Sequence, residues 1–203
     1  DVSVATTVDE EKHRVILGFN VDMLEDATEQ ADQSAVTVFR NDVIYQLIED
    51  YEAFVEDIER RRREAVIENV VRPARFRVLR DHTFRQSDPA VVGVEVTSGT
   101  LRRNVPVGYF ENGEFSRVGV LKTIQDEGED LDELRAGERA AISIEGPTIG
   151  RDIEEEDELW VDLPEKHAKV LEQELLSDLP ADEREALSQF LETKRDREPF
   201  WGK

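Results

Sequence analysis

The chain has 203 residues, of which 38% are hydrophobic, enough for one modest core or two small ones. Its formal net charge is −22, from 48 acidic residues spread along the whole length against 20 arginines and only 6 lysines. No apolar run approaches the roughly 20 residues of a membrane span, and the regular recurrence of Ile, Leu, Val and Phe argues against a disordered chain.

The dispersed acidic surface indicates adaptation to high salt. Molar salt shortens the Debye length to roughly 3 Å and so screens the repulsion between like charges. We therefore favour a halophilic protein over one whose acidic surface is a binding site. Residues 1–12 have no signal-peptide character, and we expect a cytoplasmic protein. The net charge alone does not exclude an RNA partner.

The sequence predicts neither a metal site nor a catalytic site. It has no cysteine, and its histidines (His13, His82 and His167) lie far apart without metal-binding spacing. The acidic stretches 127–133 and 152–158 lack the ligand spacing of a calcium loop and are predicted to be solvated. Phosphate-binding loops, dinucleotide fingerprints, nucleophile elbows and kinase motifs are all missing. We expect this chain to be no enzyme and to hold no cofactor.

The first elements in chain order indicate a parallel strand–helix–strand unit. Residues 14–21 and 35–39 are apolar runs of strand length, and an acidic helical stretch lies between them. Two strands and a helix cannot cover both faces of a parallel sheet. We therefore expect an incomplete α/β domain, with this chain the C-terminal part of a longer protein or with further strands outside the numbered segment.

A long amphipathic helix is predicted from about residue 42 to residue 69, capped by Asn41 and Asp42. Its apolar residues follow i, i+3, i+4, i+7 spacing: Val43, Ile44, Leu47, Ile48, Tyr51, Phe54, Val55 and Ile58. At 1.5 Å per residue it would be ~40 Å long, so its second half should leave the first domain. The arginine run Arg60, Arg61, Arg62 and Arg63 on that half is either a solvated face or a contact for RNA phosphates of the ribosome.

After Pro73 the hydrophobic period changes from 3.6 to 2. Six strands are predicted: 74–80, 91–97, 104–110, 116–124, 139–146 and 158–163. Short strands at this spacing indicate a small antiparallel barrel. Eight cations are interleaved with these strands: Arg75, Arg77, Arg80, Arg85, Arg102, Arg103, Arg117 and Lys122. They are either ordinary exposed strand residues or a local basic face of the kind that RNA phosphates need.

Helical spacing returns in the last forty residues. Two amphipathic helices starting near Pro164 and Pro180 are predicted to form a hairpin, which needs an apolar surface to cover. That surface is the barrel, a partner protein or both. The final aromatic pair, in the sequence PFWG, either docks back on the fold or binds a partner.

Together these elements predict an α+β multidomain chain. Its expected segments are a partial α/β domain (1–41), a connecting helix (42–72), an antiparallel barrel (73–163) and a C-terminal helical hairpin (164–203).

This order of parts, with the turn SGTLRRN at 98–104 and the stretches AGERAAISIEG and GRDI near residues 136–153, resembles the C-terminal half of the initiation factor 2/5B family of translational GTPases, in its archaeal form. The resemblance covers nearly the whole chain. It implies part of domain III, the connecting helix and domain IV, with GTP and magnesium bound by a G domain outside this chain. One departure is Asn104, where such barrels often have glycine, but asparagine tolerates the left-handed conformation.

The resemblance also implies binding residues for the aminoacylated acceptor end of initiator tRNA. The matching positions of the family's methionine pocket are Gly93, Val94, Ala140 and Ala141, beside Arg139, with Lys122 at a pocket lysine. The family's cysteines and second glycine are replaced here, which suits an unformylated methionine. Arg102 and Arg103 are candidates for phosphate contacts near the acceptor end, because cations position a nucleic acid while neighbouring groups read what it carries.

The two tail helices resemble the archaeal and eukaryotic extension that binds initiation factor 1A. Candidate partner contacts are Leu171, Leu175, Leu187, Phe190 and Leu191. The resemblance thus implies a monomeric module that binds initiator methionyl-tRNA, initiation factor 1A and the ribosomal subunits, with no membrane partner. Two alternatives stay open. One is an acidic scaffold whose tail helices do the binding, and the other is an enzyme or regulatory domain that uses such a barrel for a small ligand.

Overall fold

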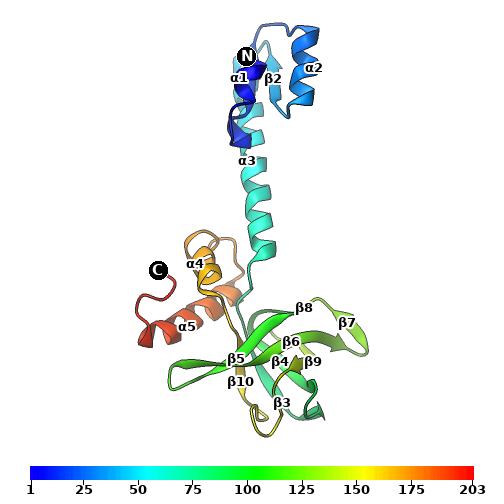
Figure 1. The fold of residues 1–203 in the computed structure, drawn as a ribbon, viewed down its shortest axis with the longest axis vertical. Helices are drawn as coiled ribbons and strands as arrows, with labels where there is room; N and C mark the ends of the chain where they lie inside the picture. The colour runs from blue at the N-terminus through cyan, green and yellow to red at the C-terminus, as the bar shows by residue number, and fades with distance from the viewer. The chain divides into compact units, whose positions relative to one another are not determined.

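The chain folds as two units, Asp1–Asn69 and Val70–Lys203, in a computed structural model that describes all of residues 1–203 (Figure 1). The long helix belongs to the first unit, and the C-terminal helices belong to the second together with the barrel. No helix of the chain is both long and apolar enough to cross a lipid bilayer.

The first unit contains the predicted parallel strand–helix–strand arrangement. In chain order its elements are α1 (Val2–Ala5), the 3-10 helix η1 (Glu11–His13), β1 (Val15–Phe19), α2 (Glu25–Gln33), β2 (Thr37–Asn41) and α3 (Ile44–Asn69). β1 and β2 run parallel, with Val15 opposite Thr37. Side chains of α1 and α2 (Val2, Ala5 and Ala31) form a small core with Val36, the residue before β2. The predicted βαβα piece is confirmed.

The helix α3 begins where the sequence predicts a cap. The Asn41 side-chain oxygen accepts the Val43 backbone N–H at 3.0 Å, which satisfies one of the free donors of the first turn. Farther along, the Phe54 ring meets the Phe39 ring of β2 edge to face, with centroids 5.4 Å apart. Ile58 is the last buried side chain of the helix, and residues 59–69 of α3 bury none.

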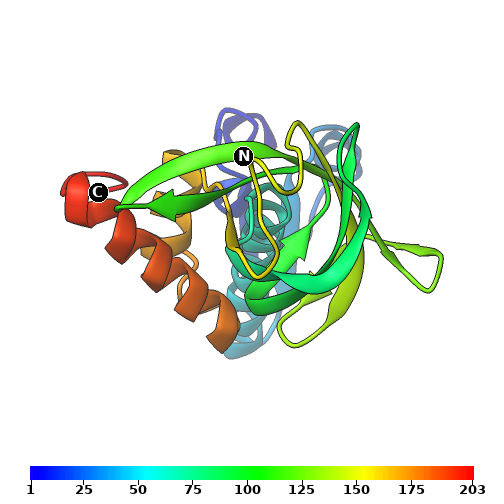
Figure 2. The ribbon, with the colours of Figure 1, turned by 90° about the horizontal axis from the view of Figure 1, so that it is seen from below.

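The second unit is built on a closed antiparallel barrel. Its strands are β3 (Ala74–Arg85), β4 (Ala90–Arg102), β5 (Val105–Glu111), β6 (Glu114–Asp126), β7 (Glu129–Leu131), β8 (Glu133–Arg135), β9 (Arg139–Glu145) and β10 (Glu158–Val161). Pairing follows the order β3–β10–β5–β6–β9–β4, and β4 pairs back with β3, which closes the ring (Figure 2). These are the six strands that the period-2 pattern predicts. Alternate apolar side chains, such as Val92 and Val94, are fully buried inside the barrel.

The short strands β7 and β8 are not anticipated by the sequence, which predicts a solvated acidic loop over 127–133. The structure pairs β7 with β6 and β8 with β4. Leu134 is buried and anchors this acidic segment to the barrel. Burial of this one apolar side chain is therefore enough to hold an otherwise acidic segment against the barrel.

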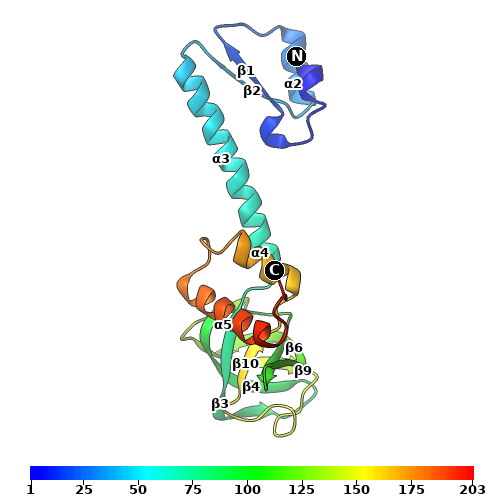
Figure 3. The same cartoon turned by 90° about the vertical axis from the view of Figure 1, so that its left-hand side faces the viewer.

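The helices α4 (Glu165–Gln173) and α5 (Ala181–Arg197) complete the second unit. α5 lies against the outside of the barrel and contacts β4, β3 and β6 (Figure 3). Phe190 of α5 packs against Phe110 and Phe115 of the β5–β6 hairpin, with centroids 5.3 and 5.7 Å away. The apolar surface that this hairpin of helices needs is therefore supplied by the barrel.

The C-terminal tail docks back onto these helices. The Trp201 ring lies 5.8 Å from the Phe190 ring. The Arg195 guanidinium donates to the carbonyl oxygens of Trp201 and Gly202, at 3.0 and 3.2 Å. Of the two roles open for this aromatic pair, Trp201 takes the structural one, whereas Phe200 remains 84% exposed.

Candidate nucleic-acid interface

The residues predicted to bind the tRNA acceptor end fall into two groups. Register pairs Gly93 with Ala141 and Val94 with Ala140 on the neighbouring strands β4 and β9. Arg102 lies nine positions farther along β4, at most ~30 Å away at ~3.3 Å per residue. Arg103 follows in the turn. The arginine pair and the predicted pocket wall are therefore at opposite ends of one strand.

The pocket wall is accessible only in part. The side chains of Val94 and Ala140 are buried. Gly93 is covered by His82, because a Cβ at Gly93 would lie 2.8 Å from the His82 Cβ. The groups that face solvent at this wall are thus the exposed His82 and the half-buried Ala141.

His82 is a residue that the sequence prediction passes over as an isolated histidine. Its Nδ1 lies 2.6 Å from the Arg80 carbonyl oxygen. Since a carbonyl can only accept a hydrogen bond, Nδ1 carries the hydrogen and Nε2 is left with a free lone pair in the neutral ring. The sequence signal that could have identified His82 is a glycine on the neighbouring strand, which leaves room for a bulky side chain to pack over it.

The turn arginines already have acidic partners. Arg102 lies 3.2 Å from the Glu133 carboxylate, and Arg103 lies 2.5 Å from that of Asp132. Their side chains remain 35% and 49% exposed. Asn104 adopts a left-handed φ of 60°, so the predicted turn is kept. A phosphate at this turn would have to compete with two carboxylates.

The environment of Glu133 favours the ionised form of its carboxyl group. Burial alone would raise the pKa of its carboxyl, but hydrogen bonds from Arg135 and Arg102 outweigh burial and hold the pKa below its ordinary value. The ion pair at Arg102 is therefore complete at neutral pH.

The other predicted cations of the pocket are paired as well. Lys122 of β6 lies 3.0 Å from the Glu145 carboxylate and two strands away from β4. Arg139 lies 2.8 Å from Glu95 on the adjacent strand. Both pairs are at the surface, where a polyanion can displace a carboxylate at small cost.

The arginine run on α3 is largely neutralised by its own unit. Arg60 and Arg61 both contact the Asp57 carboxylate, and Arg63 lies 3.9 Å from Glu59. Only Arg62 of the four has no ion pair. This pattern is that of a helix face laced with salt bridges.

The five side chains predicted to contact a partner protein are buried in the second unit. They are Leu171, Leu175, Leu187, Phe190 and Leu191. A hollow of about 320 Å³ remains open between the two helices, and its lining consists of Glu172, Leu176, Arg184, Leu187, Ser188, Leu191, Glu192 and Arg195. Leu176 is 43% exposed, so the open apolar contact of this hollow is one that the sequence prediction omits.

A buried ionic cluster fixes α5 to the barrel. Glu183, in the first turn of α5, is only 1% exposed, and its carboxylate lies 2.5 Å from the Arg72 guanidinium. The Thr100 hydroxyl donates to the same carboxylate at 2.5 Å. On α4, His167 accepts the Val71 backbone N–H through Nδ1 at 3.1 Å. Both C-terminal helices therefore hold the segment that leads into β3.

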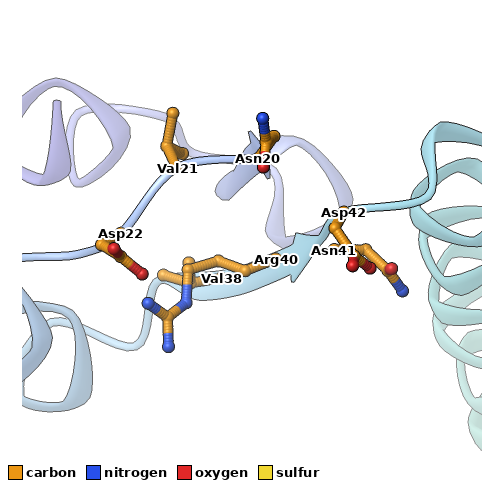
Figure 4. Close-up of a pocket in the computed structure, with 7 residues that line it drawn as sticks. All are labelled: Asn20, Val21, Asp22, Val38, Arg40, Asn41 and Asp42. Carbon is orange, nitrogen blue, oxygen red and sulfur yellow. The ribbon is translucent and has the colours of Figure 1, made fainter.

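A polar pocket of about 620 Å³ lies at the carboxyl ends of β1 and β2. It is lined by Asn20, Val21, Asp22, Val38, Arg40, Asn41 and Asp42. Figure 4 shows the Arg40 side chain reaching toward Asp22 and away from Asn41 and Asp42. Its single cation is balanced by two carboxylates, and Asn41 is engaged in capping α3. The pocket therefore has no surplus charge that would select a nucleic acid.

Family models match both units. The model described as elongation factor Tu domain 4 matches residues 72–160, which include the barrel strands, and the model described as translation-initiation factor 2 matches residues 1–52. The probable translation initiation factor IF-2 of Halobacterium salinarum is 68% identical over all 203 residues, and those of Haloarcula marismortui and Methanosarcina mazei are 62% and 45% identical. The chain belongs to the initiation factor 2/5B family.

Among solved structures, this family member resembles GDP-bound aIF5B from Aeropyrum pernix, with 35% identity and a TM-score of 0.64. The similarity covers 100% of this chain and 34% of that one. The chain likewise spans about a third of the length of the curated relatives, at 34% of the Halobacterium protein. It corresponds to the C-terminal region of an archaeal initiation factor 2/5B, and its high-identity relatives include those of halophiles.

Proposed function

We propose that this chain is the part of a translation initiation factor that binds the aminoacylated acceptor end of initiator tRNA on the ribosome, in the cytoplasm. The observation that carries the proposal is the 68% identity to a translation initiation factor over the whole chain. The closed barrel that matches an elongation factor domain supports it, because its partly exposed β4–β9 wall offers a surface on which an esterified amino acid can lie.

The nucleotide chemistry belongs to the rest of the protein in this proposal. The Aeropyrum relative is described as GDP-bound, and it is about three times as long as the part matched here. A G domain elsewhere in the protein would bind GTP and magnesium, and this chain would contribute binding without catalysis.

The wall at β4 and β9 is the proposed seat of the methionine. The cysteines implied by the resemblance are replaced by Val94 and Ala140 here, and His82 presents a nitrogen lone pair beside them. A free α-amino group donates hydrogen bonds, whereas a formylated one has lost its charge and most of its donors. The exposed acceptor therefore favours an unformylated methionine.

A protein partner is a second function that a separate observation favours. The hollow between α4 and α5 combines the exposed Leu176 with charged groups at its rim, as a short amphipathic peptide requires. We propose that the C-terminal tail of initiation factor 1A binds there. Leu176→Glu should abolish binding of that peptide, with Phe200→Ser as the control for an exposed apolar side chain outside the hollow. Deleting the helices would be a poor test, because it would expose Phe110 and Phe115.

Filter binding tests the tRNA proposal directly. The 203-residue chain is titrated in about 2 M KCl against initiator tRNA with and without its esterified methionine. We expect tighter binding of the methionylated form, because only that form reaches the β4–β9 wall. Equal affinity for the two forms would refute the assignment and favour the scaffold alternative.

A further inference from the structure

The barrel's unpaired cations are concentrated on a single strand. Eight barrel cations lie within 4.0 Å of a carboxylate: Arg75, Arg102, Arg103, Arg117, Lys122, Arg135, Arg139 and Arg151. The remaining three, Arg77, Arg80 and Arg85, have no such partner, and all belong to β3. Their side chains are exposed. In a chain of net charge −22, cations left without acids are the exception.

Two acids of the neighbouring segments, Glu155 and Asp88, have other hydrogen-bond partners. Glu155 accepts hydrogen bonds from the Asp81 backbone N–H and the Thr83 hydroxyl, both at 3.2 Å. Asp88 accepts one from the Ser87 hydroxyl at 3.4 Å. Arg85 donates through Nε to the Pro89 carbonyl oxygen at 2.7 Å, which fixes the side chain and leaves its terminal nitrogens available. The guanidinium groups are thus held ready for an anion from outside the chain.

An irregularity in β3 brings these groups beside the pocket wall. Val78 pairs with Val94, whereas Thr83 pairs with Val92, so the residues between 78 and 83 bulge out of the ladder. Bulges re-aim side chains and are frequent at the rims of barrels. The bulge carries Arg80 and places His82 over Gly93. These residues are therefore immediate neighbours of the wall, unlike Arg102 at the far end of β4.

Phe84 adds an exposed aromatic side chain on the same strand. Its ring is 65% exposed, and no aromatic neighbour packs against it in the barrel. An exposed phenylalanine between two free arginines combines a stacking platform with phosphate ligands, which is how proteins bind single-stranded nucleic acid. Contact-range stacking also survives molar salt, whereas long-range attraction does not.

We propose that Arg80, Phe84 and Arg85 of β3 form the contact for the single-stranded 3′ end of an RNA, with the arginines binding backbone phosphates and Phe84 stacking on a terminal base. This inference rests on the proposed tRNA function and assigns it to different side chains. Arg102 and Arg103, already paired with acids, would bind a phosphate only by displacing Glu133 and Asp132.

Two variants and a fluorescent tRNA test this assignment. The RNA is methionylated initiator tRNA carrying 2-aminopurine at a position of its unpaired 3′ end, and binding is followed across a series of KCl concentrations. Phe84→Leu should weaken binding at least about five-fold and remove the fluorescence quenching that stacking causes. The double variant Arg80→Ala/Arg85→Ala should lower the slope of log affinity against log salt by about 1.4, at roughly 0.7 per phosphate contact.

Matched controls separate this inference from the proposed function. Arg117→Ala removes an exposed, paired arginine elsewhere on the unit and should leave the affinity and the salt slope unchanged. If the unaltered chain binds the tRNA and Arg102→Ala/Arg103→Ala weakens it while the β3 variants do not, the β3 assignment is overturned and the proposed function stands. If the unaltered chain shows no binding, the proposed function fails as well.

Discussion

At Gly93 a hydrogen atom occupies the place where any other residue would put a Cβ, and His82 fills the space beyond it. The glycine is thus explained by packing, and the neighbour that it admits is the group exposed to a ligand. Val94 is likewise explained by packing, because its side chain is buried in the core. At this wall, the predicted residues Gly93 and Val94 are buried, and His82 is the side chain that a ligand can contact.

This packing predicts a specific loss of stability. Gly93→Ala would force its Cβ to within 2.8 Å of the His82 Cβ, so the β3 bulge must shift. We expect a loss of about 1–3 kcal/mol in the free energy of unfolding, measured by urea denaturation. The double variant Gly93→Ala/His82→Gly should recover part of it, as a positive coupling in a double-mutant cycle. Purely additive losses would show that the two positions do not press on each other.

At the scale of elements, the attachment of α5 depends on a charge that the sequence gives no reason to bury. Glu183 stands among the acids of a helix whose first turn looks solvated, yet it meets Arg72 and Thr100 inside the unit. The desolvation of both charged groups makes this pair weak evidence for stability as such. Removing only one of the two charged groups, however, leaves the other buried without a counter-charge.

Glu183→Gln should therefore destabilise the second unit by about 3 kcal/mol, because the Arg72 guanidinium would be left buried without its counter-charge. Replacing both residues by apolar ones, Arg72→Met/Glu183→Leu, should cost much less. Thermal unfolding followed by near-ultraviolet circular dichroism reads out both variants. A double variant as unstable as the single one would mean that the pair contributes net stability.

The ion pair between Glu172 of α4 and Arg195 of α5 predicts a dependence on pH. Hydrogen bonds from Arg195 hold the pKa of Glu172 below its ordinary value of 4.5. A lowered carboxyl pKa adds stability above the ordinary value, and that stability is lost as pH falls below 4.5 through the folded-state pKa. The difference in melting temperature between the chain and its Glu172→Gln variant should stay constant from about pH 7 to about pH 5 and shrink below. A difference that persists into acid would contradict this.

The regular elements follow from the sequence because each has a periodic pattern. The i, i+3, i+4 spacing from Val43 to Ile58 predicts α3, and alternation such as that of Val92 and Val94 predicts the barrel strands. The strands β7 and β8 have no such pattern, since Leu134 is their one buried anchor. The covering of the barrel by Phe190 and the pairing of Glu183 depend on long-range contacts, which no local pattern carries.

The same limit applies to the candidate site. A resemblance in sequence identifies Gly93 and Ala141, and strand register brings them together. It cannot show which arginines are free, because that depends on acids distant in sequence, such as Asp132 beside Arg103. Only the three-dimensional ion pairs distinguish Arg80 and Arg85 from the arginines of the turn.

At the scale of the whole molecule, the net charge of −22 governs the conditions under which the chain folds and binds. Self-repulsion on this scale destabilises a compact state when salt is low. We expect the melting temperature to rise steeply between about 0.1 M and about 2 M KCl, as the Debye length falls from ~10 Å to ~3 Å and below. An equal rise in sucrose without salt would attribute the effect to solute exclusion instead of screening.

Hydrogen exchange of the 203-residue chain, with and without methionylated initiator tRNA in molar KCl, shows which segments the tRNA covers. We predict that the tRNA slows exchange in the β3 bulge and in the paired segments around Gly93 and Ala141, and leaves α4 and α5 unchanged. Protection confined to the C-terminal helices or to the arginine run of α3, with none at the barrel wall, would mean that the tRNA binds away from β3, β4 and β9.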